Sequence, residues 1–239
     1  MSVWNKFRKR IRAFIPRYVP DSVVLAFYGL LSVFSVSKRV ISENAEWNRK
    51  QLEADREGIY AVCGFLENQE DWNRIKFGKK GDVAKAGCGV IATYNALYAL
   101  YSEEQKNELR GLLPEIISSY EKKGAAIGGR WGIAPHGIVE FFKTKGYRVC
   151  VYRRRTDNIE QFGTENDVLI ATAYNDRDDI LDQLHTVCIT KSYDRYYLHN
   201  AATHTTSQLG YDSLTDAVKH ISNTNPMLIS LIGVNRPFC

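Results

Sequence analysis

Hydrophobic residues recur with a helical period at the start of the chain. Within residues 1–20, large apolar side chains return at three- and four-residue steps and basic side chains fill the other positions, which predicts a basic amphipathic helix. Pro16 and Pro20 end this pattern. The 16 uncharged residues at 22–37 then predict a hydrophobic helix. Together the two helices form an N-terminal arm, residues 1–40.

The pattern changes after this arm. Residues 41–57 are mostly charged or polar and favour a helix capped by Ser42, which we expect to connect the arm to a body at residues 58–239. No internal repeat or low-complexity tract interrupts the body. The sequence therefore predicts one domain with an N-terminal appendage.

The body begins with helical periodicity and ends with strand-like runs. Helices are expected at 88–101 and 102–124, with Ser102 as N-cap and Gly124 as the stop, and Pro135 begins another. A further short helix is expected near residues 213–221. Apolar and β-branched runs predict strands at 147–153, 168–174, 185–190, 195–200 and 227–234. Helices followed by an antiparallel sheet define the α+β class.

Cysteine usage argues against a disulfide framework. Five cysteines are spread along 239 residues without a CxxC pair, so neither paired disulfides nor a zinc site is expected, and a reducing compartment fits best. Cys150 and Cys188 alternate with apolar residues in predicted strands and are expected in the core. The glycine-rich loop 124–134 lacks the arrangement of a phosphate-binding loop. We therefore expect no metal, nucleotide or other cofactor.

The positive charge of the chain is concentrated in the arm. The net charge is +5, yet residues 1–50 contain ten basic and three acidic residues, which leaves the remainder slightly negative. The apolar stretch is shorter than the roughly 20 residues that span a bilayer. We therefore predict a cytoplasmic protein held peripherally at the inner face of an anionic membrane by residues 1–40. The alternative is that these helices pack on the body or on a partner subunit. Nucleic acid is not an expected partner, because the basic residues are interleaved with large apolar ones.

One short stretch carries the chemistry. In "KAGCGVIATYNALYAL", Cys88 stands between two glycines at the start of a predicted helix. The positive end of the helix dipole favours a thiolate, and the glycines leave room for a substrate. His185 opens the predicted strand "HTVCIT" and can serve as the base, while Asn200 ends the next strand and can orient the imidazole. These three residues predict a thiol acyl-transfer site.

Three blocks carry a resemblance to a known family. The runs "NQEDWNRIKFG" to "AGCGVIATYNAL", "GGRWGIAPHGIVEFFKTKGY" and "HTVCITKSYDRYYLHNA" resemble papain-like cysteine peptidases of the bacteriocin leader-processing, or double-glycine peptidase, type. The resemblance covers roughly residues 58–234. It implies a papain-like fold and a Cys88, His185 and Asn200 triad, with Gln69 as a side-chain donor to the oxyanion.

The function expected from these observations is a thiol-dependent peptidase or amide hydrolase that acts through an acyl-enzyme on a peptide or amide substrate. An acyltransferase would use the same triad, with an amine in place of water. A catalytically weak papain-like domain that serves as a membrane-associated binding module is the remaining alternative. The pocket residues, and with them the substrate, do not follow from the sequence.

Overall fold

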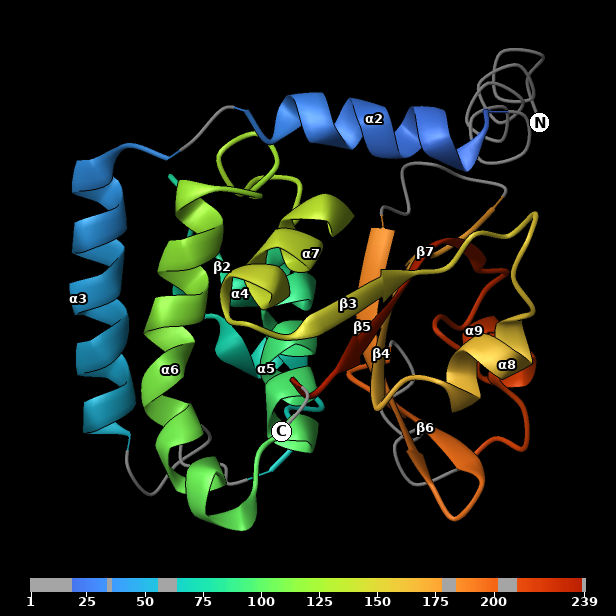
Figure 1. The fold of residues 1–239 in the computed structure, drawn as a ribbon. Coiled ribbons are helices and arrows are strands. Elements are labelled where there is room, and N and C mark those ends of the chain that lie inside the picture. The colour runs from blue at the N-terminus through green and yellow to red at the C-terminus, as the bar shows by residue number, and fades with distance from the viewer. Residues whose placement is uncertain (1–18, 34–35, 56–63, 178–183, 202–209, 238–239) are drawn as a thin grey trace.

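The helices and strands are arranged in three layers around a central antiparallel sheet (Figure 1). The computed structural model describes residues 19–33, 36–55, 64–177, 184–201 and 210–237. One side of the sheet carries the longer helices, and short helices cover the other. The longer helices are α3 (Lys38–Ala54), α5 (Cys88–Leu100), α6 (Glu103–Lys122) and α7 (Pro135–Thr144), and the short ones are α8 (Ile159–Thr164) and α9 (Leu214–Lys219). The expected α+β class is confirmed.

The sheet has five strands in the order β3-β7-β4-β5-β6, and every neighbouring pair is antiparallel. Each predicted strand is present and differs from its expected range by at most two residues at either end. The last strand in the sequence, β7, is not at an edge of the sheet, because it pairs with β3 on one side and with β4 on the other. The strands are β3 (Arg148–Val151), β4 (Val168–Tyr174), β5 (Leu184–Ser192), β6 (Arg195–His199) and β7 (Met227–Asn235).

Helix α5 is the centre of the larger hydrophobic core. Ten of its residues are buried, which explains why its sequence is apolar on all faces rather than amphipathic. It packs against β4 and β5 on one side and against α6 on the other. This enclosure holds the N-terminus of α5, and therefore Cys88, in a fixed position against the sheet.

The predicted helix boundaries in this half are confirmed. The Ser102 side chain accepts from the Gln105 backbone, and the Gln105 side chain bonds back to Ser102, which completes a capping box at the start of α6. Helix α6 ends at Lys122, just before Gly124, whose φ of 115° suits glycine. Pro135 is the first residue of α7.

Helix α3 is part of the body rather than a free connector. It begins at Lys38 with Ser37 as N-cap, so the expected start near Ser42 is wrong. Asn48 on its buried face exchanges hydrogen bonds with the backbone N–H and carbonyl of Lys76, at 2.7 and 2.9 Å. These bonds fix α3 to the hairpin of β1 (Lys76–Phe77) and β2 (Gly81–Asp82).

A buried carboxyl group joins α3, α6 and the hairpin. Oε1 of Glu121 accepts from Nδ2 of Asn44 at 2.6 Å and from the backbone N–H of Gly78 at 2.7 Å. Oε2 is buried and has no hydrogen-bond partner within the described part of the chain. Burial raises the pKa of Glu121 to about 7, although both hydrogen bonds oppose the shift. Glu121 is therefore readily protonated in the folded protein.

Helix α2 (Asp21–Leu31) lies across one end of the molecule, from the longer helices to the sheet (Figure 1). Val24 on its inner face is buried against Tyr174 and Ile229. The inner face of α2 therefore packs on the body, as in the alternative to membrane attachment given for the N-terminal arm. Its outer face exposes apolar side chains. The basic amphipathic helix expected within residues 1–18 lies outside the described residues, and no described helix is long and apolar enough to cross a membrane.

Several features were not anticipated. Helix α8, the short helix α4 (Val83–Ala86), the 3-10 turn η2 (Gln69–Trp72) and the β1–β2 hairpin have too few residues to show a clear period. The prediction that Cys150 is a core residue is wrong, because β3 is an edge strand and its Cys150 is exposed, whereas Cys188 is fully buried.

Candidate active site

Cys88 is the first residue of α5, directly after the N-cap residue Gly87. The first intrahelical bond runs from the Ile91 N–H to the Gly87 carbonyl at 2.9 Å, so the N–H groups at the start of α5 have no partner inside the helix. A Cβ at Gly87 would lie 2.6 Å from the carbonyl oxygen of Val83, which explains the glycine at the α4–α5 junction. Cys88 as a residue is partly exposed to solvent.

The structure brings His185 to Cys88. Burial alone would raise the pKa of the Cys88 thiol, but the hydrogen bond and charge of His185 and hydrogen bonds from Thr186 outweigh it, so this pKa lies below its ordinary value. Burial alone would lower the pKa of His185, yet its contact with Cys88 and a backbone hydrogen bond raise it. Both shifts favour a thiolate beside an imidazolium.

Asn200 also reaches His185, but through its backbone. Nε2 of His185 lies 2.6 Å from the carbonyl oxygen of Asn200. The prediction that the Asn200 side chain orients the ring is therefore corrected. A carbonyl only accepts, so Nε2 carries the hydrogen in the neutral ring and Nδ1 is free to take the proton of the thiol.

The side chain of Asn200 instead binds Gln69. Asn200 Oδ1 accepts from the Gln69 backbone N–H at 3.1 Å, and Asn200 Nδ2 donates to Gln69 Oε1 at 3.2 Å. Gln69 Nε2 donates to the carbonyls of Val83 and Ala84 at 3.0 and 2.9 Å, which occupies both of its hydrogens. The expected role of Gln69 as an oxyanion donor is thus not compatible with these bonds. Its amide joins Asn200 to helix α4.

A second histidine contact, between His199 and a carboxyl group, lies behind Asn200. Glu67 Oε1 is 2.7 Å from Nδ1 of His199, and Glu67 Oε2 accepts from the Asn200 backbone N–H at 2.9 Å. His199 is buried, stacks on Phe65 at 3.7 Å between ring centroids and contacts Thr190 Oγ1 at 2.8 Å. Asn200 itself has a φ of 62°, a left-handed conformation that asparagine tolerates. Glu67 and His199 therefore hold the backbone that presents the carbonyl to His185.

Sequence reasoning did not identify Glu67, His199 or Thr186 as site residues. The only signals were the position of Glu67 two residues before Gln69 and of His199 next to Asn200. The backbone N–H and hydroxyl of Thr186 bond to Cys88, and Thr186 Oγ1 lies 3.1 Å from Thr172 Oγ1 on the neighbouring strand. Threonines in a strand appear ordinary until the register is known.

Helix α2 places Tyr28 beside the site. Burial, together with the nearby charges of Cys88 and Tyr174, raises the pKa of the half-buried Tyr28. Close by along α2, the Ser32 hydroxyl lies 3.0 Å from His136 Nε2, and the carbonyl of Leu31 accepts from the N–H of Ile127 at 3.0 Å. The helix therefore lies close to Cys88 and is bonded to the glycine-rich loop.

Within the described residues, no group of three His, Cys, Asp or Glu side chains could hold a metal ion. Comparison of the chain with family models, curated proteins and solved structures finds no match.

Proposed function

We propose that this protein is a thiol-dependent peptidase or amide hydrolase with a papain-like fold. The observation that carries the proposal is the hydrogen-bonded pair of Cys88 and His185, with the imidazole held in one tautomer by the Asn200 carbonyl. A thiolate at a helix N-terminus, paired with an oriented imidazole, is the arrangement required for nucleophilic acyl transfer. The order of helices and antiparallel strands is compatible with the resemblance noted in the sequence.

The mechanism that this pair supports has two steps. The Cys88 thiolate attacks the carbonyl carbon of the scissile amide, and the free N–H groups at the start of α5 can bind the resulting oxyanion. The imidazolium of His185 gives its proton to the leaving amine as the carbon–nitrogen bond breaks, which leaves a thioester on Cys88. His185 then takes a proton from water, and the water oxygen attacks the thioester carbon. The carbon–sulfur bond breaks, the acid product leaves, and the Cys88 thiolate is again paired with the His185 imidazolium.

A test uses two small probes on a Cys150→Ser background, because the exposed Cys150 would otherwise react. We expect iodoacetamide to alkylate Cys88 rapidly at pH 6, and His185→Ala to abolish that reactivity, since the neighbouring imidazolium is lost. p-Nitrophenyl acetate should give a burst of nitrophenolate and an acetyl group on Cys88 detectable by mass spectrometry. Cys88→Ala should show neither.

The outcomes separate the alternatives. If Cys88 alkylated no faster than the exposed Cys150 does in a Cys88→Ala chain that retains Cys150, and gave no burst, the hydrolase proposal would be wrong and a binding module would remain. If glycinamide accelerated deacylation and appeared in the product, the site would be an acyltransferase. A burst followed by hydrolysis that ignores the amine would support the hydrolase.

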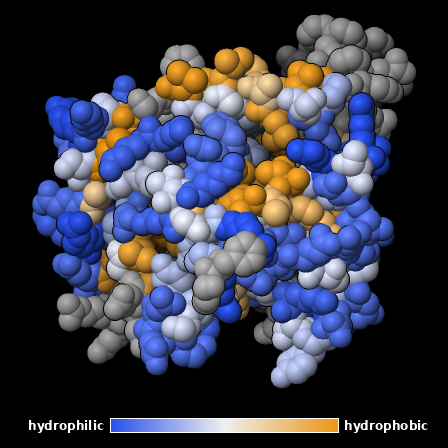
Figure 2. All heavy atoms as spheres, in the orientation of Figure 1, coloured by the Kyte–Doolittle hydropathy of each residue, from blue (hydrophilic) through white to orange (hydrophobic). Residues whose placement is uncertain are grey.

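We also propose that the protein acts at the inner, cytoplasmic face of an anionic membrane. Three outward side chains of α2 support this location, because Val23, Phe27 and Leu30 are 53%, 51% and 68% exposed. Figure 2 shows hydrophobic residues gathered along α2 at the edge of the molecule. Residues 1–18 add six basic side chains directly before this helix. Apolar and cationic groups next to each other are typical of interfacial attachment.

A further inference from the structure

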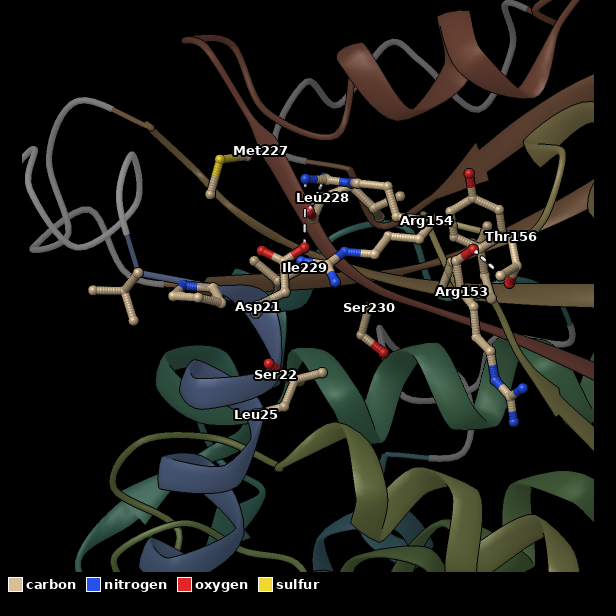
Figure 3. A pocket seen from close by; sticks show the side chains of 15 residues that line it. Asp21, Ser22, Leu25, Arg153, Arg154, Thr156, Met227, Leu228, Ile229 and Ser230 are labelled. Carbon is tan, nitrogen blue, oxygen red and sulfur yellow. Dashed lines mark hydrogen bonds and ion pairs between the residues drawn. The ribbon is translucent and has the colours of Figure 1, made fainter.

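A cavity of about 740 Å³ opens between the start of α2 and the start of β7. Figure 3 shows Asp21, Ser22 and Leu25 of α2 on one side of it and residues of β7 on the other. The lining also contains three consecutive arginines that follow β3: Arg153, Arg154 and Arg155. The cavity thus combines an apolar interior with a cationic wall.

The cavity lies beside the proposed catalytic site rather than in it. Neither Cys88 nor His185 lines it, but Ser230 does, and Ser230 pairs with Thr172 in the β4–β7 register. Thr172 in turn contacts Thr186, which bonds to Cys88. The strand β7 is two positions from β5, or about 10 Å at a spacing of about 4.8 Å. That distance corresponds to roughly three residues of an extended peptide.

The charges in the cavity are not balanced. Among the described residues that line it, Asp21 is the only acid. An Asp21 oxygen lies 3.4 Å from an Arg154 nitrogen, while another Arg154 nitrogen donates to the Leu228 carbonyl at 2.7 Å. Asp157 lies outside the cavity and accepts from the backbone of Arg153 at 2.6 Å. Arg155 is exposed at the wall, so the described lining of the cavity has an excess of positive charge.

The Asp21 carboxylate marks a position that an acidic group can occupy. It is half-buried and belongs to the first turn of α2, a short element with few contacts to the sheet beyond the Val24 cluster. Arginine presents a planar set of donors that suits a carboxylate. A carboxylate supplied by a bound peptide would compete with Asp21 for the same guanidinium.

We propose that this cavity binds an acidic side chain of the peptide substrate, a few residues from the scissile bond, with Arg154 as its partner and Asp21 as the internal carboxylate that it replaces. The assignment rests on the peptidase function proposed above. It defines the substrate class as peptides with Asp or Glu near the cleavage point, flanked by apolar residues that fit beside Leu25 and Ile229.

The experiment measures binding without turnover, on the full chain carrying Cys88→Ala. Fluorescein-labelled peptides with one Glu, scanned through each position, are compared with twins that carry Gln, by fluorescence polarisation. The best Glu peptide should bind at least about 10-fold more tightly than its twin, since hydrogen bonds to charged groups are worth more than neutral ones. Arg154→Gln should remove this preference.

Asp21→Asn gives the diagnostic result. It should strengthen binding of the Glu peptide several-fold, because the internal competitor is gone, and leave the Gln twin unchanged. Arg195→Gln is the matched control, because it breaks another exposed Arg–Asp pair, that with Asp212 at 3.1 Å, far from the cavity, and should change neither affinity. Thermal unfolding of each variant checks that the fold is retained.

Three results would overturn the inference. The first is equal binding of Glu and Gln peptides, and the second is an Asp21→Asn variant that binds the Glu peptide no better. The third is Arg154-dependent binding to phosphatidylglycerol vesicles without any peptide preference, which would assign the arginines to lipid. The catalytic proposal is tested separately by Cys88 reactivity. A preference for Glu peptides without a nitrophenolate burst would therefore reject the hydrolase proposal and still support an acidic-peptide site in the cavity.

Discussion

Replacement of Glu121 by Gln tests the buried carboxyl group between α3, α6 and the hairpin. The folded protein raises the pKa of Glu121 from its ordinary value of 4.5 to about 7, with burial as the main cause. A raised carboxyl pKa means that the protonated form stabilises the fold. This contribution is complete below pH 4.5 and is lost as the pH rises through about 7.

The size of the effect follows from the two pKa values. A difference of about 2.5 units corresponds to about 3 kcal/mol over the full range, at about 1.4 kcal/mol per unit. Between about pH 5.5 and 8.5 the loss is about 2 kcal/mol. Gln cannot ionise, but its amide nitrogen would replace Oε2, which has no partner among the described residues, at a constant cost of about 1–3 kcal/mol.

The measurement is the free energy of unfolding in urea at several pH values. Glu121→Gln should be less stable than the unmodified protein near pH 5.5, and the gap should narrow by about 2 kcal/mol by pH 8.5. Glu140→Gln is the control, because Glu140 is an exposed carboxylate 3.3 Å from Lys123. A gap for Glu121→Gln that stays constant with pH would refute the argument, since it would mean that Glu121 ionises in the folded protein as it does in the unfolded chain.

Three further predictions concern the site and the arm. Asn200→Gly should keep more Cys88 reactivity toward iodoacetamide than Asn200→Ala, because glycine retains the left-handed backbone and the carbonyl; equal losses would favour a role for the side chain. Gln69→Ala should slow alkylation and acetyl-ester turnover together, whereas loss of an oxyanion donor would slow only turnover, by about 10²-fold. The double substitution Phe27→Glu and Leu30→Glu should reduce sedimentation of the protein with phosphatidylglycerol vesicles. High salt should partly release the unmodified chain from the same vesicles, because it screens the basic residues. Unchanged sedimentation of the double variant would contradict attachment through α2.

Sequence periodicity was sufficient to predict the main helices and strands of the body. Helix α5 and strand β4 are long, apolar and buried, so the local pattern and the tertiary environment agree. Helix α3 is different, because its place in the body depends on Asn48 binding the hairpin backbone, 28 residues further along the chain. Such long-range polar bonds leave no periodic signal. The exposure of Cys150 likewise depends on strand order, which alternation within one strand does not reveal.

Residue types and spacing placed Cys88, His185 and Asn200 in one neighbourhood, and the family resemblance added Gln69, but neither gave the bonds among these residues. The amide of Asn200 was expected to meet the imidazole, whereas its positive φ turns the carbonyl toward the ring and the side chain toward Gln69. Backbone conformation of this kind depends on partners distant in sequence. Glu67, 133 residues before Asn200, supplies one of them.

The central position of β7 has a consequence for how the protein is made in the cell. Residues 227–235 fill the place between β3 and β4, so the sheet has a gap until they have been synthesised. The helices α3, α5, α6 and α7 all precede the strands of the five-stranded sheet in the chain, so they can begin to form earlier during translation. His185 stands on β5, which pairs with β4 next to that gap. A nascent chain would therefore contain Cys88 before it had a stable sheet to hold His185 beside it, and the proposed thiol chemistry would have to wait until residues 227–235 have been synthesised.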